Sequence, residues 1–231
     1  MDYCLLFADV RRRCSFRLDW HRQIGDLAIG MILSAILLLF LKKNGLLGDY
    51  GLCLPKKSLQ SMLYYLPILV LLSANLWYGV TLNYGVLETV LYILAMFCVG
   101  FLEEVIFRGF LFEAMRKDNV KVAMIVSSVT FGIGHIINLV NGSGTELLPN
   151  LLQVIYATAA GFMFVMMYCK SKSLIVCIVT HGLFNALSVF SNEASATNEM
   201  QICSAILLTV ITGSYALYLA VSMQGKRMLK E

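Results

Sequence analysis

The stretch FLEEVIFRGFLF, residues 101–112, sets two adjacent carboxylates and one arginine inside an otherwise apolar run. The charged residues are Glu103, Glu104 and Arg108, and the run around them extends from 86 to 115. As a helix it would be about 45 Å long, which exceeds the ~30 Å hydrocarbon core of a bilayer. We therefore expect this segment to tilt, kink or continue along the membrane surface. Ionisable groups at membrane depth are costly, so they usually face the protein interior and mark function.

The whole chain is far more apolar than a soluble domain. Of its 231 residues, 59% are hydrophobic and 14% are charged, and the mean hydropathy is +0.77. Soluble domains average about 25% charged residues. The apolar runs are continuous rather than alternating, which favours helices of ~20 residues over the strands of a β-barrel. The sequence predicts an all-α fold, a polytopic transmembrane helical bundle.

About seven apolar runs, within a range of six to eight, are candidate spans. They cover residues 24–41, 61–80, 86–115, 120–140, 147–169, 174–190 and 202–223. We expect a basic N-terminal tail (1–23), a single transmembrane domain (24–225) with its motif core at 86–190, and a short cytoplasmic tail (226–231). The seven cysteines are scattered without metal-ligand spacing, so no disulfide framework or cysteine zinc site is expected.

The distribution of Lys and Arg predicts the orientation. The loops after the first, third and fifth spans and the C-terminal tail contain Lys or Arg, whereas the loops after the second, fourth and sixth contain neither. This alternation places the C-terminus in the cytoplasm. The five arginines of the N-terminal tail oppose it, and their expected role is attraction to the membrane surface rather than to nucleic acid.

Three further polar residues lie inside predicted spans at comparable depth. Counted from the nearest cationic loop, Glu103, His135 and Asn185 each lie about 20 Å along their helices, and His181 lies about 14 Å along its own. His181 and Asn185 are four residues apart, as are Glu104 and Arg108, so each pair shares a helix face. We expect three spans to bring these groups together.

Two carboxylates and two imidazoles at one depth are suited to activating water for hydrolysis of a carbonyl group. One carboxylate can act as a general base on water, and imidazole or carboxamide N–H groups can stabilise an oxyanion. Alternatively, Glu103, His135 and His181 could hold a divalent metal ion such as zinc, with a metal-bound water as the nucleophile. Both routes lead to peptide hydrolysis.

Structural roles compete with these functional ones. Glu104 and Arg108 could form only a buried ion pair, and His135 and Asn185 could only join helices by hydrogen bonds. A non-catalytic membrane immunity or partner protein is one alternative function. A proton-coupled transporter is another, although no inverted repeat is visible.

At these residues the sequence resembles the CPBP family of intramembrane proteases. This family includes the type II CAAX prenyl proteases and bacterial bacteriocin-processing or self-immunity proteins. Its motifs EExxxR, FxxxH and HxxxN correspond here to Glu103–Arg108, Phe131–His135 and His181–Asn185. They occur in the family's order, each on its own predicted span, and the resemblance covers about residues 60–190. Related proteases often have eight spans, and the missing span falls at the N-terminus.

The resemblance implies a membrane-embedded endopeptidase of a bacterial plasma membrane. Glu103 and His135 would activate the attacking water, and His181 and Asn185 would bind the oxyanion. Glu104, Arg108 and Phe131 would orient the site. The implied substrate is a peptide or membrane protein within the lipid bilayer, cleaved near the cytoplasmic face. Its cleavage would serve maturation or bacteriocin immunity.

Overall fold

The described part of the chain is helical throughout. The computed structural model describes residues 24–55, 67–140 and 146–224. Within them no strand forms beyond one isolated antiparallel bridge between Val80 and Ser191. The basic N-terminal tail, residues 56–66, most of the loop after the fourth predicted span and the C-terminal tail lie outside the described residues. The predicted all-α fold is confirmed.

The helices follow the apolar runs of the sequence. In chain order they are the Ile24–Lys43 helix, α2 (Ile68–Leu72), the 3₁₀ segment η2 (Ser73–Leu76), α3 (Val86–Glu104), the π-helical segment η3 (Val105–Phe112), α4 (Glu113–Arg116), α5 (Val120–Gly134), the 3₁₀ segment η4 (His135–Leu139), α6 (Leu147–Ser171), α7 (Leu174–Leu187), the 3₁₀ segments η5 (Ser188–Phe190) and η6 (Glu193–Ser195), and α8 (Asn198–Gln224).

Among the described residues, five helices are long and apolar enough to cross a membrane. They are Ile24–Lys43, Val86–Arg116, Val120–Leu139, Leu147–Ser171 and Asn198–Met223. The apolar helix Leu174–Phe190 is shorter and has the bounds predicted for the sixth span. The second predicted span, 61–80, begins outside the described residues, and its described part is α2 and η2 rather than one long helix.

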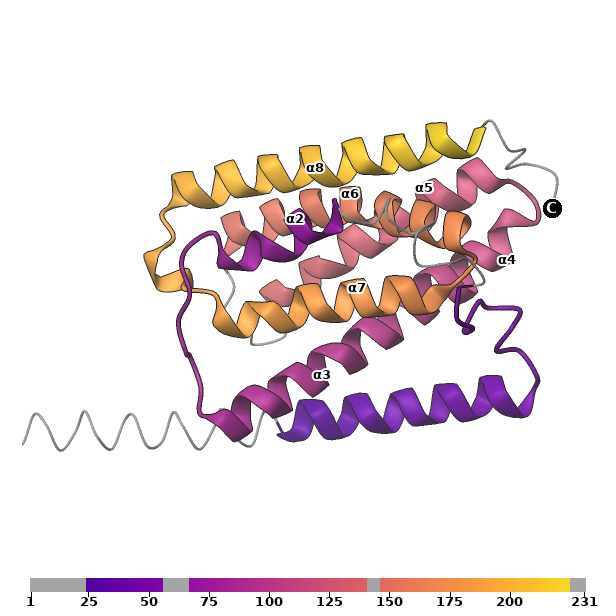
Figure 1. Ribbon diagram of the computed structural model, residues 1–231, viewed down its shortest axis with the longest axis horizontal. Coiled ribbons are helices and arrows are strands. Elements are labelled where there is room, and N and C mark those ends of the chain that lie inside the picture. The colour runs from indigo at the N-terminus through magenta and orange to yellow at the C-terminus, as the bar shows by residue number, and fades with distance from the viewer. Residues whose placement is uncertain (1–23, 56–66, 141–145, 225–231) are drawn as a thin grey trace, which may run out of the picture.

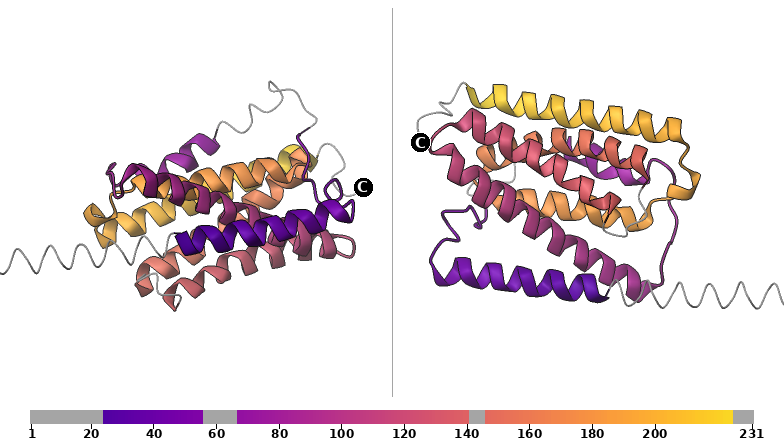
Figure 2. Two further views of the ribbon diagram at one scale, coloured as in Figure 1. Left: turned by 90° about the horizontal axis from the view of Figure 1, so that it is seen from below. Right: turned by 180° about the vertical axis from the view of Figure 1, so that it is seen from behind.

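Helix α6 lies at the centre of the bundle and packs against both α5 and α8 (Figure 1). Its second half provides a run of buried side chains from Met163 to Tyr168. Flexible methionine side chains fill irregular gaps between helices, which suits a helix with neighbours on several sides. Seen from behind, α3 runs obliquely across the bundle below α5 (Figure 2).

The long third span changes its helical form at the charged motif. Residues up to Glu104 are α-helical, and the eight residues of η3 are π-helical. A π-helix is rare and widens the turn, which often occurs at functional sites. The span contains two glycines: Gly109 lies within η3, whereas Gly100 lies within regular α3. The wide turn begins directly after the two glutamates.

Close approach of α3 and α7 depends on two glycines. A Cβ atom on Gly100 would lie 2.9 Å from the backbone nitrogen of Gly182, and a Cβ on Gly182 would lie 2.5 Å from the Phe97 ring. A side chain at either glycine would collide with the facing helix. The crossing lies one turn from Glu103 and Glu104 on α3 and one residue from His181 on α7, so it sets the distance between the motifs.

Replacing Gly100 by valine should therefore separate α3 from α7. Overpacking of this kind typically costs about 1–3 kcal/mol. We expect a lower midpoint of thermal unfolding, followed by thiol labelling of the buried Cys177 as the bundle opens. Gly213→Ala is the matched control, because a Cβ there meets nothing within 4 Å. An unchanged midpoint for Gly100→Val would contradict the close crossing.

The described Lys and Arg residues other than Arg108 gather at one end of the bundle, together with Asp49, Glu113 and Asp118. At this end the segment 42–53 contacts the connection between α6 and α7, since Leu174 N donates to Gly51 O and Ser173 Oγ donates to Cys53 O. Lys170 Nζ at the end of α6 donates to Ser222 Oγ on α8. We call this the cationic end; it also carries Lys43, Arg116, Lys121 and Lys172. The opposite end, which we call the acidic end, contains Asp26, Glu88, Glu146, Glu193 and Glu199. Among the described residues, no Lys or Arg lies there.

Candidate active site

A buried ionic network connects two of the three motifs. Arg108 Nη1 donates to Glu104 Oε1 at 3.0 Å, as the four-residue spacing predicted, and both side chains are fully buried. The same oxygen lies 2.9 Å from His181 Nδ1 on α7. Arg108 Nη2 also donates to the Gly161 carbonyl on α6. The Glu104–Arg108 pair thus joins α3, η3, α6 and α7.

Two phenylalanines enclose this network. The Arg108 guanidinium carbon lies 4.2 Å above the centre of the Phe131 ring and 5.1 Å from that of Phe164. Phe164 also stacks on the His181 ring, with centroids 5.3 Å apart. Aromatic faces attract cations, and this attraction grows when water is excluded. Phe131, the first residue of the second motif, therefore contacts the first motif directly.

Glu103 occupies a different environment from its neighbour Glu104. The Glu103 side chain is 33% exposed, whereas the Glu104 side chain is fully buried. Glu103 Oε2 is buried 3.5 Å from His181 Nε2, and the exposed part of the Glu103 side chain lines a cavity. The two adjacent carboxylates are thus divided between a buried ionic network and an accessible space.

His135 reaches the same cavity from the end of α5. It is the first residue of η4, and its Nδ1 lies 3.0 Å from the Phe131 carbonyl oxygen. A carbonyl can only accept, so Nδ1 carries the proton and Nε2 keeps its lone pair in the neutral ring. The Asn150 amide on α6 donates to the His135 carbonyl at 2.8 Å and fixes the backbone there.

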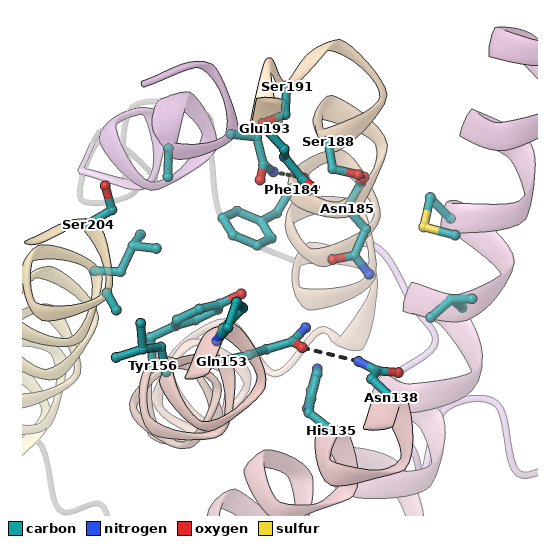
Figure 3. Close-up of a pocket in the computed structure, with 18 of the residues that line it drawn as sticks. His135, Asn138, Gln153, Tyr156, Phe184, Asn185, Ser188, Ser191, Glu193 and Ser204 are labelled. Carbon is teal, nitrogen blue, oxygen red and sulfur yellow. Dashed lines mark hydrogen bonds between the residues drawn. The ribbon is translucent and has the colours of Figure 1, made fainter. Parts of the chain in front are cut away.

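The cavity has a volume of about 1110 Å³ and is lined by Glu103, Phe131, His135 and Asn185. Figure 3 shows the Asn185 and His135 side chains on opposite sides of it, from α7 and η4. The three motifs, far apart in the sequence, therefore each supply a side chain to one space. The expectation that three spans bring polar groups to similar depth agrees with this geometry.

His181 lies behind the cavity wall rather than in it. It is buried, and its two ring nitrogens face Glu104 and Glu103. Asn185, one turn further along α7, lines the cavity instead. In this structure His181 is therefore in a position to orient Glu103 rather than to bind an oxyanion itself. Its direct catalytic role stays a prediction.

Two of the three ligands predicted for a metal ion are adjacent, since His181 Nε2 lies 3.5 Å from Glu103 Oε2. The other ring nitrogen of His181 faces Glu104. Within the described ranges no group of three or more His, Cys, Asp or Glu side chains forms a ready metal site. The divalent ion expected at Glu103, His135 and His181 stays a prediction.

The cavity extends to the acidic end of the bundle. Its walls include the exposed residues Asp26, Glu146 and Glu193, which lie at the start of the Ile24–Lys43 helix, before α6 and in η6. Exposed carboxylates of the acidic end thus form part of the cavity wall. The expected cleavage near the cytoplasmic face stays a prediction.

The sequence pattern did not reveal several residues around the site. Asn150 is fully buried, and Gln153 accepts a hydrogen bond from Asn138 at 3.1 Å beside the cavity. Both lie three residues apart within an apolar span, and that spacing was a usable signal. Phe164 carried no signal, because one aromatic residue in an apolar helix is ordinary.

Comparison with known proteins agrees with the motifs. Residues 85–187 match the model of the Rce1-like type II CAAX prenyl endopeptidases. The protein named "Putative membrane peptidase YdiL" of Bacillus subtilis (strain 168) is 31% identical over 115 residues. That match covers 49% of this chain and 42% of the length of the relative. No solved structure matches.

The family match falls on the helices that carry the site. The matched segment runs from the start of α3 to the end of α7 and includes all three motifs. With its several apolar helices, the chain is an integral, multi-pass membrane protein. Residues 85–187 are similar to the Rce1-like type II CAAX prenyl endopeptidases, which agrees with the resemblance indicated by the three motifs.

Proposed function

We propose that this protein is a membrane-embedded endopeptidase that hydrolyses a peptide bond with an activated water molecule. One observation carries the proposal: Glu103, His135 and Asn185, from three motifs, line one cavity within a bundle of membrane-spanning helices. The family match and the name of the Bacillus subtilis relative support peptidase activity.

The geometry supports a division of roles. The Glu103 carboxylate takes a proton from water, and the lone pair of His135 Nε2 orients that water on the other side. The Asn185 carboxamide donates a hydrogen bond to the oxyanion that forms. His181 holds the buried oxygen of Glu103, and Glu104 with Arg108 holds His181. The proton taken by Glu103 then passes to the leaving amine.

The cellular setting follows from the same features. The positions of Lys and Arg favour a cytoplasmic C-terminus, with the acidic end and its part of the cavity wall on the opposite face. The source of the relative favours a bacterial plasma membrane. We propose maturation of a peptide or membrane protein, including bacteriocin processing or immunity, as the role.

Peptide cleavage by the purified protein tests this function. The full chain is reconstituted in lipid vesicles with apolar reporter peptides, and the products are identified by mass spectrometry. The proposal predicts two fragments from cleavage at an internal bond. Flux of a solute or protons across the vesicle membrane with intact peptides would instead favour the transporter. A cellular effect that survives Glu103→Gln would favour the non-catalytic partner.

A further inference from the structure

The walls of the cavity carry two features that both attract cations. Carboxylates come from three separate elements: Asp26 from the first helix, Glu146 from the start of α6 and Glu193 from η6. No Lys or Arg is found on the wall among the described residues. Charges placed around one concave space of low dielectric focus their field, so a cationic ligand is favoured and an anionic ligand is disfavoured.

Aromatic side chains supply the second feature. Four tyrosines, Tyr78, Tyr84, Tyr92 and Tyr156, line the same cavity. Tyr84 and Tyr92 stack with centroids 6.1 Å apart, and the Tyr92 hydroxyl is hydrogen-bonded to Ser188 Oγ at 2.8 Å. Two of these rings are thereby held in place. Tyrosine faces attract ammonium and guanidinium groups, whereas they do not favour carboxylates.

The distribution of charge over the whole molecule points the same way. The described Lys and Arg residues lie at the cationic end, except for Arg108, which is buried against Glu104. The cavity ends at the acidic end, where Glu193 and Tyr156 are visible on its wall in Figure 3. A substrate that entered carboxylate-first would meet carboxylates and tyrosine rings and no cation on the described wall.

We propose that the cavity selects a cationic peptide segment, with Lys or Arg side chains between the tyrosines and the carboxylates while the adjacent bond lies at Glu103. Glu146 and Glu193 are then specificity-determining residues. This substrate class rests on the proposed endopeptidase function. It describes internal cleavage beside a basic segment rather than recognition of a free C-terminal carboxylate.

Binding of matched peptides tests this inference without turnover. The full chain carrying Glu103→Gln is placed in vesicles of uncharged phosphatidylcholine, so that the lipid surface does not concentrate the peptide. Three fluorescent peptides share one apolar sequence and differ only in having Lys, Gln or Glu at the variable positions. We expect the Lys peptide to bind about tenfold more tightly than the Glu peptide, with a preference that weakens at high salt.

Variants that remove carboxylates locate the preference in the cavity. The double variant Glu146→Gln/Glu193→Gln should lower the Lys-to-Glu affinity ratio to about twofold. Glu199→Gln removes one carboxylate at the same end and is compared with each of the single variants Glu146→Gln and Glu193→Gln. Glu199 does not line the cavity and pairs with Thr197, so the ratio should be unchanged. Equal affinity for the three peptides, tighter binding of the Glu peptide, or an equal loss in the control would overturn the inference.

Cleavage of the same peptides by the unmodified protein separates the two proposals. Cleavage without any preference for charge would overturn the substrate class and leave the endopeptidase. Selective binding of the Lys peptide with no cleavage would overturn the endopeptidase and leave a cation-selective peptide site.

Discussion

Replacing Arg108 by methionine is expected to destabilise the bundle by about 3–5 kcal/mol, because the change leaves the carboxylate of Glu104 buried without its cation. Arg108 and Glu104 have no exposed side-chain area and are 3.0 Å apart. Arg108 also reaches the Gly161 carbonyl on α6. The loss should appear as a lower unfolding midpoint in detergent, measured by labelling of the buried thiol of Cys177.

A second ion pair on the same segment is the control. Arg116 Nε lies 2.7 Å from Glu113 Oε2, but the Arg116 side chain is 30% exposed. The Glu113 side chain is 10% exposed, so this pair is partly rather than fully buried, and Arg116→Met should shift the midpoint less than Arg108→Met does. Equal shifts for Arg108→Met and Arg116→Met would contradict the buried network. Partial recovery by Arg108→Met combined with Glu104→Gln would identify the unpaired charge as the cause.

Replacing Glu103 by glutamine is expected to reduce peptide cleavage by about 100- to 10,000-fold, the usual contribution of a general base. Glutamine has nearly the same shape as glutamate, but it cannot take a proton from water. The free energy of unfolding should stay within about 1 kcal/mol of that of the unmodified protein, because this side chain is partly exposed in the cavity. The measurement is kcat/KM in vesicles.

Glu113→Gln is the matched control for this change. Glu113 lies on the same segment, pairs with Arg116 and is absent from the described wall of the cavity. It should keep its rate of cleavage. If Glu103→Gln also kept its rate, Glu103 would not be the base.

The charged motif predicted a large part of this site from spacing alone. A four-residue separation places Glu104 and Arg108 on one helix face, and an arginine inside an apolar span must find an acceptor. The pair observed at 3.0 Å follows from these two constraints. Counting residues from the cationic loops also brought Glu103, His135 and Asn185 to one level, since helices rise by a constant amount per residue.

The remaining features depend on packing that a sequence pattern does not encode. The sequence of residues 105–112 does not distinguish a π-helix from an α-helix, so the wide turn was not predictable from it. The division between His181, behind the wall, and Asn185, in it, depends on how α7 rotates at the Gly100–Gly182 crossing. The acidic end of the cavity is assembled from three elements, whose carboxylates Asp26, Glu146 and Glu193 are far apart in the sequence.

The most direct test of the central claim follows one turnover in water enriched in oxygen-18. The unmodified protein in vesicles is mixed with a reporter peptide in limiting amount, and both peptide products and the intact protein are weighed by mass spectrometry. Hydrolysis by water held at Glu103 predicts oxygen-18 in the new carboxyl group, an unchanged protein mass throughout, and no product from Glu103→Gln on the same timescale. A covalent adduct on the protein, a product without oxygen-18, or the same product formed by Glu103→Gln at the unmodified rate would contradict it.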